Sequence, residues 1–194
     1  MAKEIRKCGW CVGNELYEKY HDDEWGTPNY DDQQLFEFLL LEGAQAGLSW
    51  ITILKKREGY RKAFDRFDAE KIARYTPARI NKLLQNPEIV RNRLKVESAV
   101  SNARLFLDLR EQTGSFSDYV WQFVDHTPRQ NRFRSLEQVP ATTPASDRMC
   151  KTMKKDGFRF VGSTICYAYM QATGMVNDHL VSCFRHEECL RLSK

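Results

Sequence analysis

The stretch Leu35–Lys56 places one acidic residue among apolar and small residues, ahead of a tryptophan. Leu35, Phe38 and Leu39 have the spacing of one helical face. Glu42 takes the next position on that face, and Trp50 follows eight residues later. A carboxylate within an apolar stripe is costly unless it is paired, hydrogen-bonded or faces a cavity, so Glu42 is a candidate for a functional site. The alternative is a core helix in which Glu42 bonds to the neighbouring backbone.

Cysteine and histidine residues near the two ends of the chain form a second constellation. His179 and Cys183 are four residues apart on a predicted helix, so both side chains point the same way. Such a pair is half of a zinc site. The other half is either Cys8 with Cys11, the knuckle spacing that the sequence alone favours, or Cys8 with His21. The remaining alternative is a set of unconnected core thiols and a surface histidine.

These residues must be positioned by helices, because almost every segment carries helical signals and no stretch shows convincing strand alternation. The sequence therefore predicts an all-α fold. His126–Thr143 is polar, with two prolines and three arginines, and is predicted as a connecting loop. The expected helices, in chain order, are one capped by Asn14 that runs through His21, a pair starting at Asp31 or Asp32, one from Thr76-Pro77 to Asn86-Pro87, a long one from about Glu88 to Gly114, Phe116–Val124, one capped by Ser146 or Asp147, a buried one over Val161–Thr173, and a last one capped by Asn177 or Asp178.

Composition limits the class of protein. The chain has 194 residues, 42% hydrophobic and 29% charged, which is typical of a globular domain. A net charge of +4 permits a nucleic acid partner without requiring one. The N-terminal residues lack the apolar run of a signal peptide and no stretch approaches the length of a membrane span, so we expect a cytoplasmic protein with no membrane partner. In a reducing compartment the six cysteines are metal ligands or buried thiols rather than disulfides.

Six motifs in a fixed order make the sequence specific enough to compare with a known family. Together they resemble the bacterial DNA-3-methyladenine glycosylase I family, from Lys7 to about Phe184. The motifs are C-G-W at Cys8–Trp10, Y-x-x-Y-H-D-x-E-W-G at Tyr17–Gly26, L-E-G-x-Q-A-G-L-S-W at Leu41–Trp50, V-G-x-T-I-C-Y at Val161–Tyr167, M-Q-A-x-G at Met170–Gly174 and V-N-D-H at Val176–His179.

The resemblance implies a helical enzyme of the helix-hairpin-helix glycosylase class that excises 3-methyladenine from alkylated double-stranded DNA. It also implies a structural zinc ion whose ligands match Cys8, His21, His179 and Cys183. This set selects His21 over Cys11 and reverses the preference from spacing. Four protein ligands suit a structural zinc, because a catalytic one keeps an open position. We expect no other cofactor.

The resemblance further implies which residues bind the base. Glu42 and Tyr20 match residues that hydrogen-bond the lesion, and Trp10 and Trp50 match aromatic walls of the pocket. Methylation at N3 makes the adenine cationic and a good leaving group. A negative charge and electron-rich ring faces therefore suit it. Glu42 is expected to act on the base electrostatically, and a role as general base is the weaker hypothesis.

Base flipping requires further residues. A base inside a duplex must be turned out at a cost of a few kcal/mol. Leu48, with Gly47, matches the element that fills the gap, and Tyr17 and Trp25 are expected to line the pocket. No lysine nucleophile has a matching motif, so we expect a monofunctional reaction that leaves an abasic site and releases free 3-methyladenine.

DNA binding is expected at the Thr76–Lys95 hairpin. Backbone N–H groups of a helix start near Ile89 are suited to phosphate. The turn over Asn86–Val90 departs from the usual pattern because it has no glycine. Nearby cations are Arg91, Arg93 and Lys95.

We expect one compact monomer with two lobes, residues 1–30 with 145–194, held by the zinc, and residues 31–144, which contain the hairpin. Two other functions stay open. One is a zinc-stapled module that binds DNA or a nucleobase without cleaving it, and the other is a helical protein whose zinc and aromatic residues are purely structural. Glu42, Tyr20 and the two pocket tryptophans argue against both, because neither function needs a pocket complementary to a cation.

Overall fold

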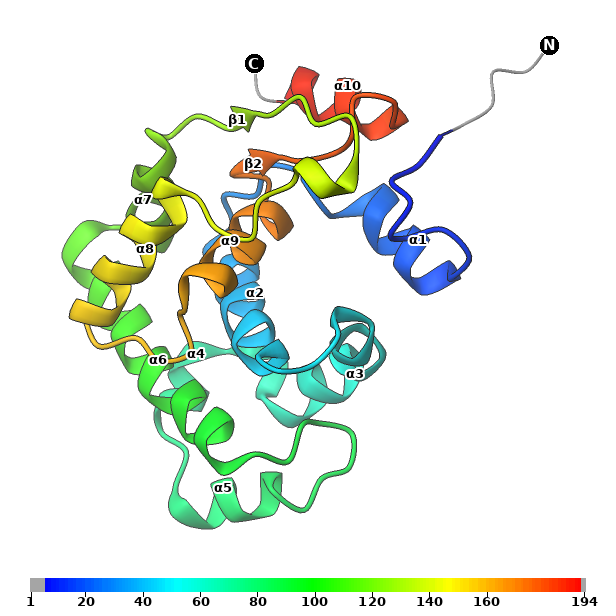
Figure 1. Ribbon diagram of the computed structural model, residues 1–194. Coiled ribbons are helices and arrows are strands. Elements are labelled where there is room, and N and C mark those ends of the chain that lie inside the picture. The colour runs from blue at the N-terminus through cyan, green and yellow to red at the C-terminus, as the bar shows by residue number, and fades with distance from the viewer. Residues whose placement is uncertain (1–5, 193–194) are drawn as a thin grey trace.

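The computed structural model describes residues 6–192 and confirms the all-α fold (Figure 1). The expected terminal lobe includes residues 1–5 and 193–194, which lie outside the described residues. The α-helices are α1 (Glu15–Asp23), α2 (Asp32–Gln45), α3 (Trp50–Ala63), α4 (Ala69–Ala73), α5 (Pro77–Leu83), α6 (Arg93–Thr113), α7 (Phe116–Trp121), α8 (Pro144–Lys155), α9 (Ser163–Ala172) and α10 (Phe184–Leu192). Short 3-10 turns are η1 (Asp65–Phe67), η2 (Gln122–Val124) and η3 (Leu136–Gln138).

Local capping signals explain several helix starts. The side chain of Asn14 accepts a hydrogen bond from the Tyr17 N–H at 3.1 Å, and Thr76 accepts one from the Arg79 N–H at 3.3 Å. Both caps were predicted. The cap predicted at Ser146 or Asp147 was wrong, because α8 starts three residues earlier with Thr143 as its cap. Ser146 is instead the third helical residue of a capping box with Thr143.

Two further predictions differ from the structure. The long helix does not begin near Glu88, because residues 84–92 form an irregular turn and α6 begins at Arg93. The short helix expected around His179 and Cys183 is absent from the described residues. Instead, residues Val176–Asn177 form a short strand, β2. It pairs in parallel with β1 (Arg129–Gln130), which lies inside the predicted connecting loop. A turn then leads to α10.

The core is organised around α2. Ten consecutive residues of this helix, from Leu35 to Ala44, are buried. The helix lies in the middle of the molecule and packs against α3, α6, α7 and α9 (Figure 1). A helix apolar nearly all round is expected to be buried in this way. One core cluster combines Tyr20 and Phe158 of the expected terminal lobe with Phe106 of the other, so the two lobes share a core, while their division stays a prediction.

Gly174 allows the N-terminal segment to lie against the end of α9. Its φ is +70°, and a Cβ at this position would lie 2.3 Å from the backbone N of Pro28. The Asn29 N–H donates to the Thr173 carbonyl at 3.0 Å beside this contact. This close approach places the segment after α1 against the C-terminal end of α9. Within residues 6–192, no helix combines the length and apolar character needed to cross a bilayer.

Candidate active site and Cys/His cluster

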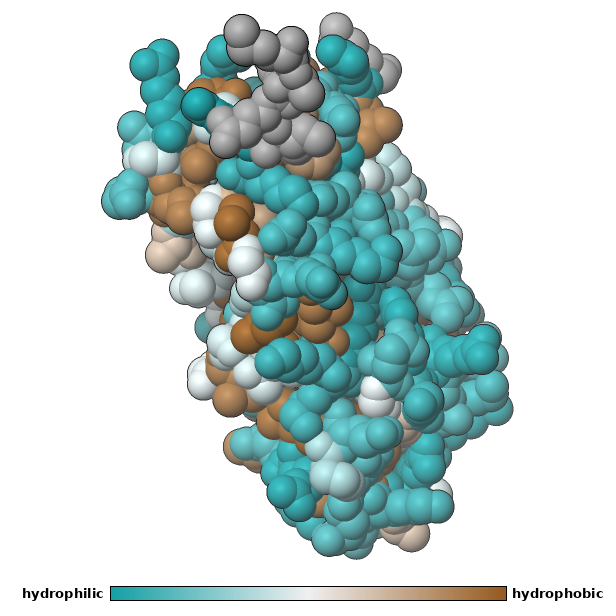
Figure 2. Space-filling model, turned by 90° about the vertical axis from the view of Figure 1, so that its right-hand side faces the viewer, coloured by the Kyte–Doolittle hydropathy of each residue, from teal (hydrophilic) through white to brown (hydrophobic). Residues whose placement is uncertain are grey.

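A cavity of about 380 Å³ opens among α1, α2, α3, α9 and the segment around η3. Its size suits a small ligand. Six of the residues expected to bind the base line it, namely Trp10, Tyr17, Tyr20, Trp25, Glu42 and Trp50. Figure 2 views the molecule from the side that carries α1 and α3, where brown and white patches interrupt a mostly hydrophilic face. The fold therefore gathers residues from three separate sequence motifs around one hollow.

Glu42 lies near the C-terminal end of α2 and is only 3% exposed. Burial raises the pKa of its carboxyl group to about 8, because low polarity disfavours the charged form. Burial and the nearby charge of Glu42 together raise the pKa of the Tyr20 phenol well above its usual value. The Tyr20 hydroxyl therefore keeps its proton, and a cation in the pocket would favour ionised Glu42.

Two buried polar atoms of the pocket residues are unpaired. Glu42 Oε2 and Trp50 Nε1 have no hydrogen-bond partner among the residues that the structure describes. Buried polar groups are normally paired, so an acceptor and a donor left open in one pocket point to a bound ligand. The rings of Tyr20 and Trp50 lie 5.5 Å apart between centroids, and those of Trp10 and Trp25 lie 5.1 Å apart. The open polar atoms are thus enclosed by aromatic surface.

Tyr17, Gly47 and Leu48 differ in their placement. Tyr17 lines the pocket, and its hydroxyl accepts a hydrogen bond from the Ile51 N–H at 2.9 Å, at the start of α3. Gly47, with φ +78°, and Leu48 lie outside the pocket in the α2–α3 loop. The Leu48 side chain is 41% exposed. An exposed leucine beside a pocket is the placement that a gap-filling wedge needs.

The sequence did not identify every pocket residue. Gln45, Gln171 and Asp178 line the cavity and stand inside quoted motifs, which was an available signal. Leu136 and Val139 also line it, but they come from the stretch predicted as a connecting loop, where nothing in the sequence marks them. The other residue that the sequence missed is Ala168.

Asp178 is a second buried carboxylate of the pocket wall. Unlike Glu42 it is fully paired. It accepts hydrogen bonds from Asn131 at 2.6 Å, from the Tyr167 hydroxyl at 2.6 Å and from Gln171 at 2.8 Å. These bonds join the turn after β2 to α9 and to the segment that follows β1. Asp178 therefore supports the pocket, whereas Glu42 is the acid left open in it.

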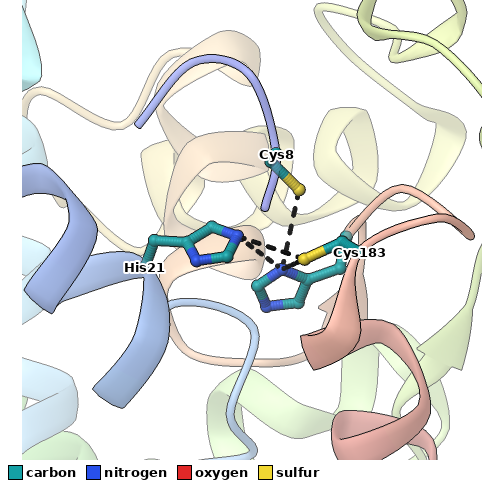
Figure 3. Close-up of side chains that lie close together, drawn as sticks. Cys8, His21 and Cys183 are labelled. Atoms are coloured by element: carbon teal, nitrogen blue, oxygen red, sulfur yellow. Dashed lines mark hydrogen bonds between the residues drawn. The ribbon is translucent and has the colours of Figure 1, made fainter. Parts of the chain in front are cut away.

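The Cys/His cluster consists of Cys8, His21, His179 and Cys183, all buried, with their ligand atoms within 4.8 Å of one another. His21 Nε2 lies 3.2 Å from His179 Nδ1 and 3.4 Å from Cys183 Sγ. Figure 3 shows the side chains of Cys8, His21 and Cys183 converging from separate segments. Cys11 stays apart, and its thiol donates to the Cys8 carbonyl at 3.0 Å. The arrangement favours His21 over Cys11.

The donor atoms of the cluster fit a zinc ion. Two thiol sulfurs and two imidazole nitrogens are a common set for four-coordinate structural zinc. The other ring nitrogens have their own partners: His21 Nδ1 lies 2.8 Å from an Asp22 carboxylate oxygen, and His179 Nε2 lies 2.9 Å from the Trp25 carbonyl oxygen. Metal-binding histidines usually have such partners.

In the hairpin between α5 and α6, the structure contradicts two expectations, a helix start near Ile89 and a phosphate-binding role for Lys95. Ile89 is 2% exposed and lies in the irregular turn, so no helix begins there. Lys95 is not free to bind phosphate, because its ammonium group donates to the carbonyls of Ala44 and Ala46, both at 2.7 Å. Arg91 and Arg93 remain exposed at the surface.

Comparison with known proteins agrees with this fold. The sequence profile described as methyladenine glycosylase matches residues 10–186. The chain therefore belongs to the methyladenine glycosylase family, which confirms the resemblance seen in the motifs. Over 179 residues it is 48% identical to DNA-3-methyladenine glycosylase 1 of Escherichia coli K12, covering 92% of this chain and 96% of the relative.

Solved structures extend the similarity to three dimensions. A crystal structure of 3-methyladenine DNA glycosylase I has a TM-score of 0.90 and 50% identity, over 92% of this chain and 98% of that chain. The Staphylococcus aureus 3-methyladenine DNA glycosylase I, whose structure concerns 3-methyladenine recognition, has a TM-score of 0.89 and 35% identity, over 94% of this chain and 97% of that chain.

Proposed function

We propose that this protein is a DNA repair glycosylase that excises 3-methyladenine from alkylated double-stranded DNA. One observation carries the proposal. An aromatic pocket contains both a buried acceptor without a hydrogen-bond partner, Glu42 Oε2, and a buried donor without one, Trp50 Nε1. Relatives named for this activity support it.

The charge of the lesion explains the choice of pocket residues. N3-methylated adenine in DNA carries a positive charge, which pairs with ionised Glu42 and lies against the electron-rich faces of Trp10 and Trp50. Stacking on aromatic rings contributes about 1–3 kcal/mol per base. Neutral adenine brings no positive charge to favour the ionised form of Glu42, so it gains none of this attraction. The pocket therefore discriminates by charge as well as by shape.

The reaction needs little help from the protein. Water adds to the sugar C1′ and loses one proton to the solvent, the N-glycosidic bond breaks, and its electron pair leaves with the base, which becomes neutral 3-methyladenine. Glu42 supports this step by stabilising the positive charge as it passes from the base to the sugar in the transition state. Among the residues that line the pocket there is no lysine to attack the sugar. The product is therefore an abasic site in an intact strand.

Leu48 is proposed to fill the gap that the flipped nucleotide leaves. It is exposed on the loop between α2 and α3, both of which contribute pocket residues. Its insertion offsets part of the few kcal/mol that flipping costs. Helices α5 and α6, with the turn over residues 84–92, are proposed as the hairpin that contacts the DNA backbone, and the protein is proposed to act as a monomer.

The Cys/His cluster is proposed to hold one structural zinc ion. Zinc would be bound by Cys8, His21, His179 and Cys183 and would fix the N-terminal segment against the turn before α10. Metal analysis of the purified protein should give one zinc per chain. A folded, active protein without bound metal, unaffected by a chelator, would rule this proposal out.

Base release from methylated DNA tests the function. The protein is incubated with alkylated duplex DNA, and the released bases are separated and identified. Release of 3-methyladenine but not of 7-methylguanine is expected, and Glu42→Gln should be slower. Glu111→Gln, which alters an exposed carboxylate on α6, is the matched control. A folded protein that binds the DNA but releases no base would favour the non-enzymatic binding module instead.

A further inference from the structure

The loop that carries Leu48 is held at both of its ends by side chains from distant helices. At its start, α2 ends at Gln45, and its C-cap residue Ala46 has non-helical angles, with φ −42° and ψ 115°. The last carbonyls of a helix lack partners within it. Two of them, those of Ala44 and Ala46, accept hydrogen bonds from Lys95 Nζ at 2.7 Å each. At the other end of the loop, Tyr17 of α1 accepts from the Ile51 N–H.

Lys95 is suited to this position by its charge. An ammonium group at a helix C-terminus interacts favourably with the helix dipole, and here it also forms two charge-assisted hydrogen bonds. The side chain is half-buried, and no ion pair within residues 6–192 involves it. Its partners are therefore the backbone carbonyls at the end of α2. These two hydrogen bonds restrict the motion of the loop at the point where it leaves α2.

The same residue belongs to the first turn of α6, directly after the hairpin turn. The Lys95 N–H donates to the cap residue Asn92 at 3.2 Å. Lys95 therefore connects the base of the hairpin to the loop next to the pocket. The loop itself is tight, because Gly47 has φ +78° and the Leu48 N–H donates to the Gln45 carbonyl at 2.6 Å.

We propose that Lys95 is a positioning residue for base flipping, which closes the C-terminal end of α2 and so holds Leu48 at the height and direction needed to enter the duplex. This role rests on the proposed glycosylase function. It differs from that of a phosphate-binding cation, because Lys95 acts through Leu48 and not through the DNA backbone. Hairpin and wedge then approach the DNA as one rigid unit.

The test compares Lys95→Met with Lys95→Arg, which keeps the charge and the donors. Lys151→Met, on the exposed face of α8, is the control for losing one lysine. Excision is measured in single turnover with enzyme in saturating excess over methylated duplex DNA. We expect Lys95→Met to be slower by about tenfold, which corresponds to about 1.4 kcal/mol of activation free energy. Lys95→Arg should recover most of the rate, and Lys151→Met should not change it.

Two further readouts separate positioning from a general structural effect. Binding of free 3-methyladenine, followed by tryptophan fluorescence, should stay within about twofold of the unsubstituted protein, because the pocket itself is intact. Lys95→Met combined with Leu48→Ala should be no slower than Leu48→Ala alone, because both changes remove the same action. If Lys95→Met does not fold, Lys95→Gln replaces it in both measurements.

Several outcomes would overturn the positioning role. One is that Lys95→Met and Leu48→Ala lower the excision rate independently, so that their effects multiply in the double variant. Another is that Lys95→Met weakens binding of free 3-methyladenine as much as it slows excision. A third is a rate defect that disappears at saturating enzyme, which would indicate a phosphate contact. Unchanged excision by Lys95→Met in an active protein would overturn this role alone. Absence of base release by the unsubstituted protein would overturn the proposed function and this role with it.

Discussion

Replacing Glu42 by glutamine should make the stability of the protein less dependent on pH. Burial raises the pKa of Glu42 from 4.5 to about 8, so the native state retains this proton at a pH where the unfolded chain has released it. The free energy of unfolding therefore falls as the pH rises from the unfolded pKa to the folded one. Each pH unit in this window is worth about 1.4 kcal/mol, which gives about 3 kcal/mol between about pH 5.5 and pH 8.

Chemical denaturation measures this effect directly. The unsubstituted protein and Glu42→Gln are unfolded at about pH 5.5, 7 and 8 under otherwise identical conditions. Their difference in free energy of unfolding should shift by about 3 kcal/mol in favour of the variant across this range. Any difference in the free energy of unfolding that the amide group causes at every pH is constant, so it does not affect this shift. Glu111→Gln removes an exposed carboxylate and should show a difference that does not change with pH.

The reasoning fails if the difference between Glu42→Gln and the unsubstituted protein is the same at all three pH values. That result would mean that Glu42 is already ionised in the empty pocket. It would also remove the argument that a cationic base, and not the protein, supplies the partner of this carboxylate. A difference that grows in the opposite direction would mean that the ionised form has a native partner.

Three other predictions concern the metal, the pocket wall and the packing of α3. Cys183→Ser should reduce bound zinc and lower the unfolding temperature, and a chelator should then have no further effect; retention of one zinc per chain would contradict this. Trp50→Ala should weaken binding of free 3-methyladenine by about 1–3 kcal/mol, measured by calorimetry, and an unchanged affinity would exclude stacking. Gly59→Ala should lower stability by about 1–3 kcal/mol, because its Cβ would lie 2.6 Å from Glu88; Gly162→Ala, with open space at the Cβ, should change it much less.

Local signals in the sequence were sufficient for the fold class and for several helix starts. Asn14 and Thr76 cap helices through their own side chains, and such bonds depend on residues three positions away. His179 and Cys183 show the limit of this approach. Their spacing suggested one helical face, yet they converge through the turn that follows β2. The two residues meet as predicted, but for a different structural reason.

Contacts between distant residues were beyond the reach of the sequence pattern. Leu136 reaches the pocket from a polar stretch because the chain is anchored nearby by β1 and β2. Lys95 looked like a cation for phosphate because the carbonyls that it binds lie 49 and 51 residues earlier in the chain. Unsatisfied carbonyl groups at a helix end leave no mark in a sequence. The family motifs supplied the pocket residues that spacing alone did not.

The Cys/His cluster has a consequence for the order of events during synthesis. Cys8 and His179 are 171 residues apart, so a growing chain exposes its N-terminal half of the cluster long before the other half leaves the ribosome. Trp10 and Trp25 of the pocket lie against His21 and His179 of the cluster. The pocket walls are therefore assembled only when translation is nearly finished. A chain that ends before Asp178 therefore lacks part of the pocket lining.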